Sequence, residues 1–200
     1  DMTGRFTHTT AKFLEAYSTV ATAPLEGDLR EHAAAQAARL FDALDDLWSA
    51  DQEHYGIRIR DGKLDDRADS AALELVSGVK AYAEIASVDD ETLVRLEKHV
   101  ENVVTKLYRD SGDGVAGLVR YEGDPWRRHD QVEEKIWSVS TALGARAAAE
   151  LGILVETLGY DPDDLLDLAS DLYSLLLNDG PFGTDVGFLA EQVFDDGEPD

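Results

Sequence analysis

The chain has 200 residues, of which 44% are hydrophobic, and this is enough for one domain with a substantial core. Its 42 acidic and 18 basic residues give a formal net charge of −24. With such a charge we expect no nucleic-acid binding, because phosphate recognition needs a clustered basic face. No stretch of 18 apolar residues occurs, so no membrane-spanning segment is expected, and the absence of cysteine excludes disulfides and thiolate metal sites.

The acidic surplus is typical of a protein adapted to high salt. Asp outnumbers Glu and Arg outnumbers Lys, and at molar ionic strength the Debye length falls to about 3 Å, which screens repulsion between surface carboxylates. An ordinary acidic protein from a low-salt environment is the alternative. Because the chain starts at Asp1-Met2-Thr3 and stops at Asp200 in loop-like sequence, we expect both ends to lie inside a longer protein. The missing signal peptide therefore does not decide secretion, and a cytoplasmic location is the working expectation.

Six helices are predicted from apolar residues spaced three and four positions apart. They cover residues 6–21, 28–49, 70–85, 90–108, 135–158 and 163–177. The segment 137–158 is apolar on nearly every face and is expected to be buried, whereas 28–49 and 90–108 carry a charged side. This alternation of inner and outer helices predicts an all-α fold with two concentric layers.

Three local signals mark the ends of these elements. The Asp89-Asp90 pair and Asp161 are expected to cap the helices that follow them, and Pro162 suits a first helical position. Asp61-Gly62 is a turn pair that favours positive φ, and its flanking residues 55–60 and 63–64 alternate in the manner of a short hairpin.

No motif for a metal, a cofactor or a nucleophile is present, and we expect no cofactor. The five histidines are scattered along the chain, and we expect each to have a surface or capping role. Residues 110–114 offer oxygen ligands but lack the calcium-loop spacing, so they are interpreted as a turn.

The segment 117–126 has a composition suited to binding sugar. It combines Arg120 and Asp124, which can bind vicinal hydroxyls, with Tyr121 and Trp126, whose flat faces can cover the C–H patch of a pyranose. An exposed loop with ordinary surface acids is the alternative interpretation.

A second candidate is Glu191, which follows three apolar residues in the segment 187–193. A partly desolvated carboxylate beside a polar amide can act as a general base. By composition alone, however, Glu191 is one of 42 acidic residues.

These segments together resemble glycoside hydrolase family fifteen, the glucoamylases and their trehalase-like relatives. The sequence RYEGD at 120–124 resembles the family's arginine-tyrosine-x-x-aspartate loop, and WSVST at 137–141 resembles the tryptophan that opens the next inner helix. LAEQ at 189–192, followed by Gly197, resembles the loop of the catalytic base, and FTHT at 6–9 resembles the segment after the catalytic acid.

The resemblance implies an (α/α)6 barrel of which residues 1–200 form one segment with about half of the helices. It implies that Glu191 is the general base, that Arg120 and Asp124 bind the terminal glucose, and that Tyr121, Trp126 and Trp137 line the subsite. The family's catalytic acid lies in a tryptophan-glutamate motif that would precede Asp1. The partners implied are an α-glucan or glucose-containing oligosaccharide and the remainder of the parent barrel.

Three functions remain open at this point. The first is an inverting, exo-acting hydrolase that releases glucose from α-glucans or malto-oligosaccharides, and the second is an α,α-trehalase of the same family, which the segment 6–8 favours. The third is a helical module that binds glycan or protein without catalysis.

Overall fold

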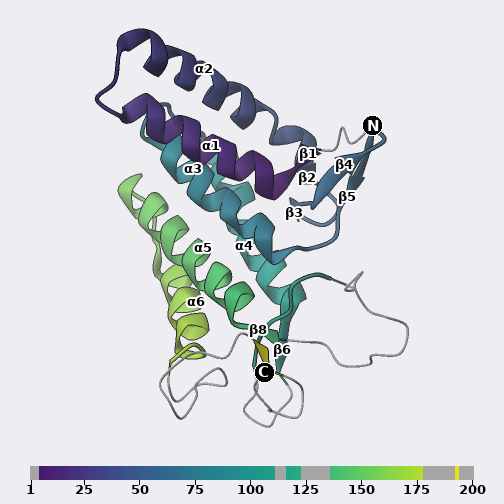
Figure 1. Ribbon diagram of the computed structural model, residues 1–200. Coiled ribbons are helices and arrows are strands. Elements are labelled where there is room, and N and C mark those ends of the chain that lie inside the picture. The colour runs from purple at the N-terminus through teal and green to yellow at the C-terminus, as the bar shows by residue number, and fades with distance from the viewer. Residues whose placement is uncertain (1–4, 111–115, 123–135, 178–191, 194–200) are drawn as a thin grey trace. The chain divides into compact units, whose positions relative to one another are not determined.

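The helices predicted from the sequence are present in the computed structural model, which describes residues 5–110, 116–122, 136–177 and 192–193. Within these residues the chain forms six α-helices, and the remaining elements are short strands and two 3-10 turns. The helices are α1 (Thr7–Thr22), α2 (Gly27–Asp42), α3 (Leu75–Ala83), α4 (Asp90–Leu107), α5 (Ser138–Thr157) and α6 (Asp163–Ser174) (Figure 1). The all-α prediction is confirmed.

The contacts within the chain divide it into two compact units. The described residues up to 66 and those from 72 to 102 make the first unit, while residues 67–71 and the described residues from 103 onward make the second. Residues 67–71 therefore belong to the second unit, although the residues on either side of them in sequence belong to the first. The expectation that residues 1–200 form a single barrel segment stays a prediction.

In the first unit, α1 packs against both α2 and α3 (Figure 1). The contact with α3 is close at Gly78, because a Cβ atom there would lie 2.8 Å from the carbonyl oxygen of Ala11. A three-stranded antiparallel sheet has the order β1 (Arg5–Phe6), β4 (Arg58–Arg60), β5 (Lys63–Asp65). Strand β1 leads directly into α1, and β4 and β5 precede α3 in sequence. A second pair joins β2 (Trp48–Ser49) to β3 (His54–Tyr55).

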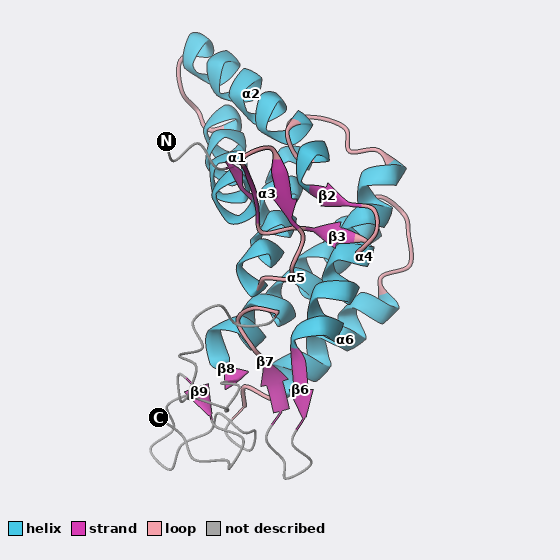
Figure 2. Cartoon of the chain, turned by 90° about the vertical axis from the view of Figure 1, so that its right-hand side faces the viewer, coloured by secondary structure: helices cyan, strands magenta, loops and turns pink. Residues whose placement is uncertain are grey.

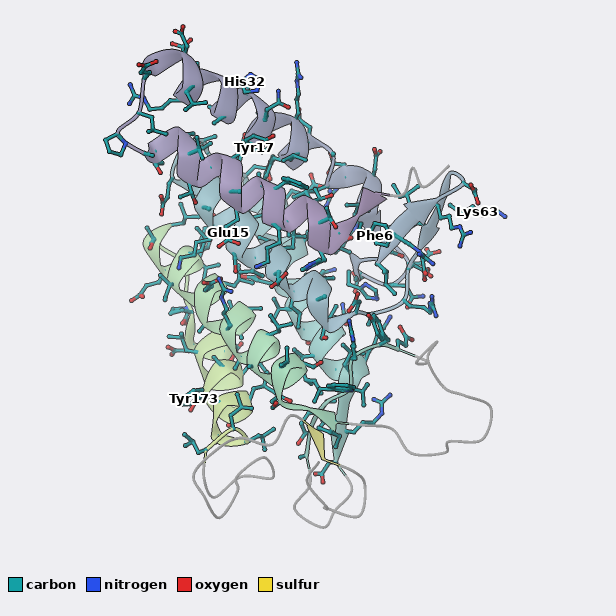
Figure 3. All side chains as sticks on the ribbon, in the orientation of Figure 1. Phe6, Glu15, Tyr17, His32, Lys63 and Tyr173 are labelled. Carbon is teal, nitrogen blue, oxygen red and sulfur yellow. The ribbon has the colours of Figure 1, made fainter. Side chains whose placement is uncertain are left out.

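The predicted hairpin and both predicted caps are confirmed. Asp61 and Gly62 have φ angles of 51° and 73°, and Lys63 lies at the tip of the β4–β5 hairpin (Figure 3). The Asp89 carboxylate accepts a 2.8 Å hydrogen bond from the N–H of Thr92, and this bond lowers the pKa of Asp89. Asp161 accepts one of 3.1 Å from the N–H of Asp163 at the start of α6. The first helical position expected for Pro162 was wrong, because α6 begins at Asp163 and Pro162 is its N-cap residue.

Three predicted helix starts and ends were wrong. The helix expected over 28–49 ends at Asp42, because the 3-10 turn η1 (Asp45–Leu47) leads into β2, where Trp48 pairs with Tyr55. The helix expected over 70–85 begins with the 3-10 turn η2 (Ser70–Glu74). The helix expected from residue 135 begins at Ser138, because the preceding Trp137 is extended and belongs to a strand.

In the second unit, α5 packs against α6 and against the strand β7 (Ala116–Leu118). Gly144 permits this packing, since a Cβ atom there would lie 2.8 Å from Leu118 Cδ1 and 3.0 Å from Leu172 Cδ1. Helix α5 is long and apolar enough to cross a bilayer, but 56% of its apolar window is buried within the protein, as in a core helix.

The expectation that nearly every face of the 137–158 helix is buried was wrong for the described residues. Val139 is 60% exposed and Ile153 is 49% exposed, although both lie on α5. The side of α5 that carries Leu151 and Val155 is buried, so the helix has one covered and one open apolar side.

Candidate functional site

Backbone pairing brings three predicted segments together next to the start of α5. The strand β6 (Tyr108–Asp110) pairs with β7, and the chain then continues through Val119, which forms an isolated bridge with Ile136. Strand β8 (Ile136–Trp137) pairs in turn with β9 (Gln192–Val193), so that Trp137 lies opposite Gln192 (Figure 2). Residues far apart in sequence therefore meet in one small group of strands.

The segment 67–71, which we call the strap, lies along the other side of the 120–122 segment. The N–H of Ser70 donates to the carbonyl of Arg120 over 3.1 Å, and the N–H of Glu122 donates to the carbonyl of Ala68 over 2.9 Å. Asp69 and Tyr121 form an antiparallel bridge between these two bonds. The backbone on both sides of Tyr121 is thus fixed by the strap.

Buried hydroxyl groups connect these segments to the first turn of α5. Thr141 Oγ1 accepts the N–H of Leu118 and donates to the carbonyl of Trp137, each over 3.0 Å. Ser70 Oγ and Ser140 Oγ are 3.0 Å apart, and both side chains are almost fully buried. The first turn of α5 therefore holds the strap, β7 and Trp137 by hydrogen bonds.

Of the six residues predicted to form the site, three are described. Arg120 is exposed, and its guanidinium carbon lies 4.9 Å from the centre of the half-buried Tyr121 ring, a cation–π geometry. Trp137 is half-buried beside the fully buried Ile136. The remaining predicted residues lie outside the described residues, namely Asp124, Trp126 and Glu191.

The structure brings together some of the segments that carry the predicted residues. Through the Val119–Ile136 bridge, it joins the segment that leads into Arg120 and Tyr121 to the strand that carries Trp137. It also pairs Trp137 with Gln192, the residue that follows Glu191 in sequence. The roles predicted for these side chains stay predictions.

The polar residues that hold this arrangement were not predicted from the sequence. Ser140 and Thr141 fall inside the WSVST motif, but only the tryptophan received a role. Three hydroxyl residues among the first four positions of an otherwise apolar helix are the signal that could have identified them.

The predicted surface or capping role was wrong for two histidines of the first unit. His54 and His99 are fully buried, because their ring nitrogens satisfy backbone groups in the core. His99 Nδ1 accepts the N–H of Tyr55, and His99 Nε2 contacts the carbonyl of Ala72 at 3.1 Å. His8, in contrast, is exposed and pairs with Glu74.

Other polar groups of the first unit line a cavity of about 230 Å³. Its walls include Asp42, Asp89 and Arg95, and Arg95 forms ion pairs with Asp45 and Glu91. Across the described parts of the chain, no group of three or more His, Asp or Glu residues could hold a metal ion. The residues of the interpreted turn 111–114 lie outside the described residues.

The chain has the fold of part of a helical barrel found in sugar-processing enzymes. It is similar to a solved alpha-amylase from Clostridium perfringens, with a TM-score of 0.60, 8% identity, and coverage of 98% of this chain and 49% of that chain. It is similar also to a D-mannose isomerase, with a TM-score of 0.65, 14% identity, and coverage of 98% and 50%. The chain thus spans about half the length of these two enzymes.

At these identities the likeness shows the fold alone. No family model matches the chain, and no curated protein matches it. The predicted class, an all-α chain that supplies about half of a helical barrel, is confirmed.

Proposed function

We propose that this chain is part of an inverting, exo-acting glycoside hydrolase that releases glucose from the non-reducing ends of α-glucans or malto-oligosaccharides. The register of β8 and β9 is the observation that carries the proposal. It pairs Trp137 with Gln192, next to Glu191 in sequence, on a strand that also bridges to Val119, next to Arg120. The likeness to two sugar-processing enzymes supports the same class of substrate.

Each residue of the site has a role in this mechanism. Arg120 and Asp124 bind the hydroxyls of the terminal glucose, and the rings of Tyr121, Trp126 and Trp137 cover its apolar faces. Glu191 removes a proton from the water that attacks the anomeric carbon. Inversion also needs a carboxylic acid roughly 6.5–9.5 Å from the base to protonate the leaving oxygen. The resemblance places that acid upstream of Asp1, so the 200 residues alone are inactive in this proposal.

The remainder of the parent barrel is the partner that this proposal requires. The chain matches about half of each sugar-processing neighbour, and α5 exposes Val139 and Ile153. A groove of about 500 Å³ between α5 and α6 is lined by small and apolar side chains that a further helix could contact, namely Ala142, Ala145, Ala149, Leu166, Ala169 and Tyr173.

Replacing Glu191 by Gln in the parent protein tests the proposed base. We expect the rate of glucose release from maltose to fall by roughly 10²–10⁴-fold, because an amide cannot accept the proton of the attacking water. Glu156→Gln is the matched control, since it removes one exposed carboxylate from α5 and should leave the rate unchanged. Equal rates for both variants would rule out Glu191 as the base.

Two alternative activities can be distinguished from the proposed one by the substrate consumed and the product formed. Trehalose hydrolysis, favoured by the segment 6–8, would release glucose from trehalose but not from maltose. Sugar isomerisation is a second candidate because the D-mannose isomerase has the higher TM-score of the two neighbours, 0.65 against 0.60. It would convert a monosaccharide to its ketose without consuming water. A binding module would form no product and would keep its sugar affinity in the Glu191→Gln variant.

A further inference from the structure

Glu122 lies between the proposed glucose ligands Arg120 and Asp124 in sequence, but the proposed mechanism gives it no role. Its carboxylate Oε2 accepts the backbone N–H of Ala68 over 2.9 Å. The N–H of Glu122 donates in return to the carbonyl of Ala68, also over 2.9 Å. Residues 68 and 122 are therefore joined by two hydrogen bonds, one from the main chain and one from the side chain.

These two hydrogen bonds form one end of the short ladder between the strap and the 120–122 segment. At the other end of the ladder, the N–H of Ser70 donates to the carbonyl of Arg120. Tyr121 lies between the two anchored positions, and its ring is the surface on which the Arg120 guanidinium rests. The orientation of the Arg120–Tyr121 pair thus depends on how firmly the strap holds residues 120 and 122.

The strap is itself held by one bond to α5 and stiffened by one bond within it. The hydroxyl of Ser70 bonds with that of Ser140 in the first turn of α5, and the Asp69 carboxylate accepts the N–H of Ala71 over 2.9 Å. Because Ser70 is 2% exposed and Ser140 is 3% exposed, water does not compete for their bond. A contact from Glu122 to the strap is therefore a contact to a fixed support.

Lys106 is a charged residue close to this carboxylate. Its Nζ atom lies 4.0 Å from Glu122 Oε2, too far for a hydrogen bond. Removing the lysine charge would leave both bonds between Glu122 and Ala68 in place, which makes Lys106 a suitable control.

We propose that Glu122 is a positioning residue of the sugar site, whose carboxylate fastens the 120–122 segment to the strap and thereby orients Arg120 and Tyr121 toward the glucose. The inference rests on the proposed function. Glu122 acts through the backbone of Ala68 and contributes no proton transfer, so it sets affinity for the sugar more than the rate of the chemical step.

The test compares three variants of the parent protein, Glu122→Ala, Glu122→Gln and Lys106→Ala. Deuterium exchange of peptides containing Ala68 measures the bond, and titration with maltose measures sugar affinity. The alanine variant should exchange faster at Ala68 and bind maltose about tenfold more weakly, the effect of one lost hydrogen bond. Its KM should rise while kcat changes little. The glutamine variant keeps an oxygen that can accept the N–H, so it should retain affinity, as should Lys106→Ala.

Each other outcome has a defined meaning. Unchanged exchange at Ala68 in the alanine variant would overturn the inference, and so would faster exchange with unchanged maltose affinity. Equal weakening in Lys106→Ala would assign the effect to charge and would also overturn it. In all three cases maltose binding by the unsubstituted protein leaves the proposed function intact. An unsubstituted protein that neither binds nor hydrolyses maltose would refute the proposed function and the inference together.

Discussion

Replacing His99 by Gln should remove much of the stability loss expected when this protein is moved from pH 8 to pH 5. His99 lies on α4 and is fully buried. Because the carbonyl of Ala72 can only accept, Nε2 carries the proton and Nδ1 accepts the N–H of Tyr55. Burial lowers the pKa of His99 to about 3, against the opposing effect of the Ala72 hydrogen bond and with a small contribution from His54.

The magnitude follows from linkage between protonation and folding. In the unfolded chain a histidine titrates near pH 6.5, so acidification protonates the unfolded state before the folded state. The stabilising effect of a neutral, buried His99 is complete above that pH and is lost progressively as the pH falls toward about 3. At pH 5 the loss from this residue is about 2 kcal/mol of the free energy of unfolding.

Urea unfolding followed by tryptophan fluorescence, at pH 8 and pH 5 and constant ionic strength, measures this loss. A glutamine can donate to Ala72 and accept from Tyr55 but does not titrate, and His54 is present in both proteins. The difference in stability between the two pH values should therefore be about 2 kcal/mol smaller in His99→Gln than in the unsubstituted protein. The same difference in both proteins would refute the reasoning.

Three further predictions follow from packing, hydrogen bonding and charge. Gly78→Ala should lower the free energy of unfolding by about 1–3 kcal/mol, because its Cβ would meet the Ala11 carbonyl. Gly27→Ala, with open space around it, should stay within about 0.5 kcal/mol, and equal urea midpoints for the two would contradict this packing. Thr141→Val should cost about 1–3 kcal/mol by leaving the Leu118 N–H unpaired, and Thr141→Ser should restore most of it. A serine variant as unstable as the valine variant would contradict this role of the hydroxyl. Raising KCl from 0.1 to 2 M should increase the melting temperature, because salt screens a net charge of −24, and a flat or falling curve would argue against a salt-adapted surface.

Local sequence signals predicted the helices well because each depends on neighbouring residues. The caps at Asp89 and Asp161 and the turn at Asp61-Gly62 need only a few positions of sequence, and all three are confirmed. The end of α2 was missed because β2 forms by pairing Trp48 with Tyr55, seven residues further on. An apolar periodicity that continues through Leu44 and Leu47 cannot reveal that pairing.

The site was predictable as a set of motifs but not as an arrangement. The motifs identified the segments that could carry site residues. The pairing of Val119 with Ile136 and of Trp137 with Gln192, however, depends on the register between segments distant in sequence. The bond from Glu122 to Ala68 spans 54 residues, and no local pattern marks it. The buried His99 was missed for a related reason, since its hydrogen bonds to Tyr55 and Ala72 join positions 44 and 27 residues apart in sequence and make burial of its polar ring favourable.

The configuration of the sugar released tests the central claim most directly. Proton NMR of the parent protein acting on maltose should show β-glucose accumulating first from the cleaved α-linkage, because water attacks the face opposite the leaving group. Release of α-glucose as the first product would contradict the inverting mechanism. Absence of any glucose release from maltose would contradict the proposed function itself.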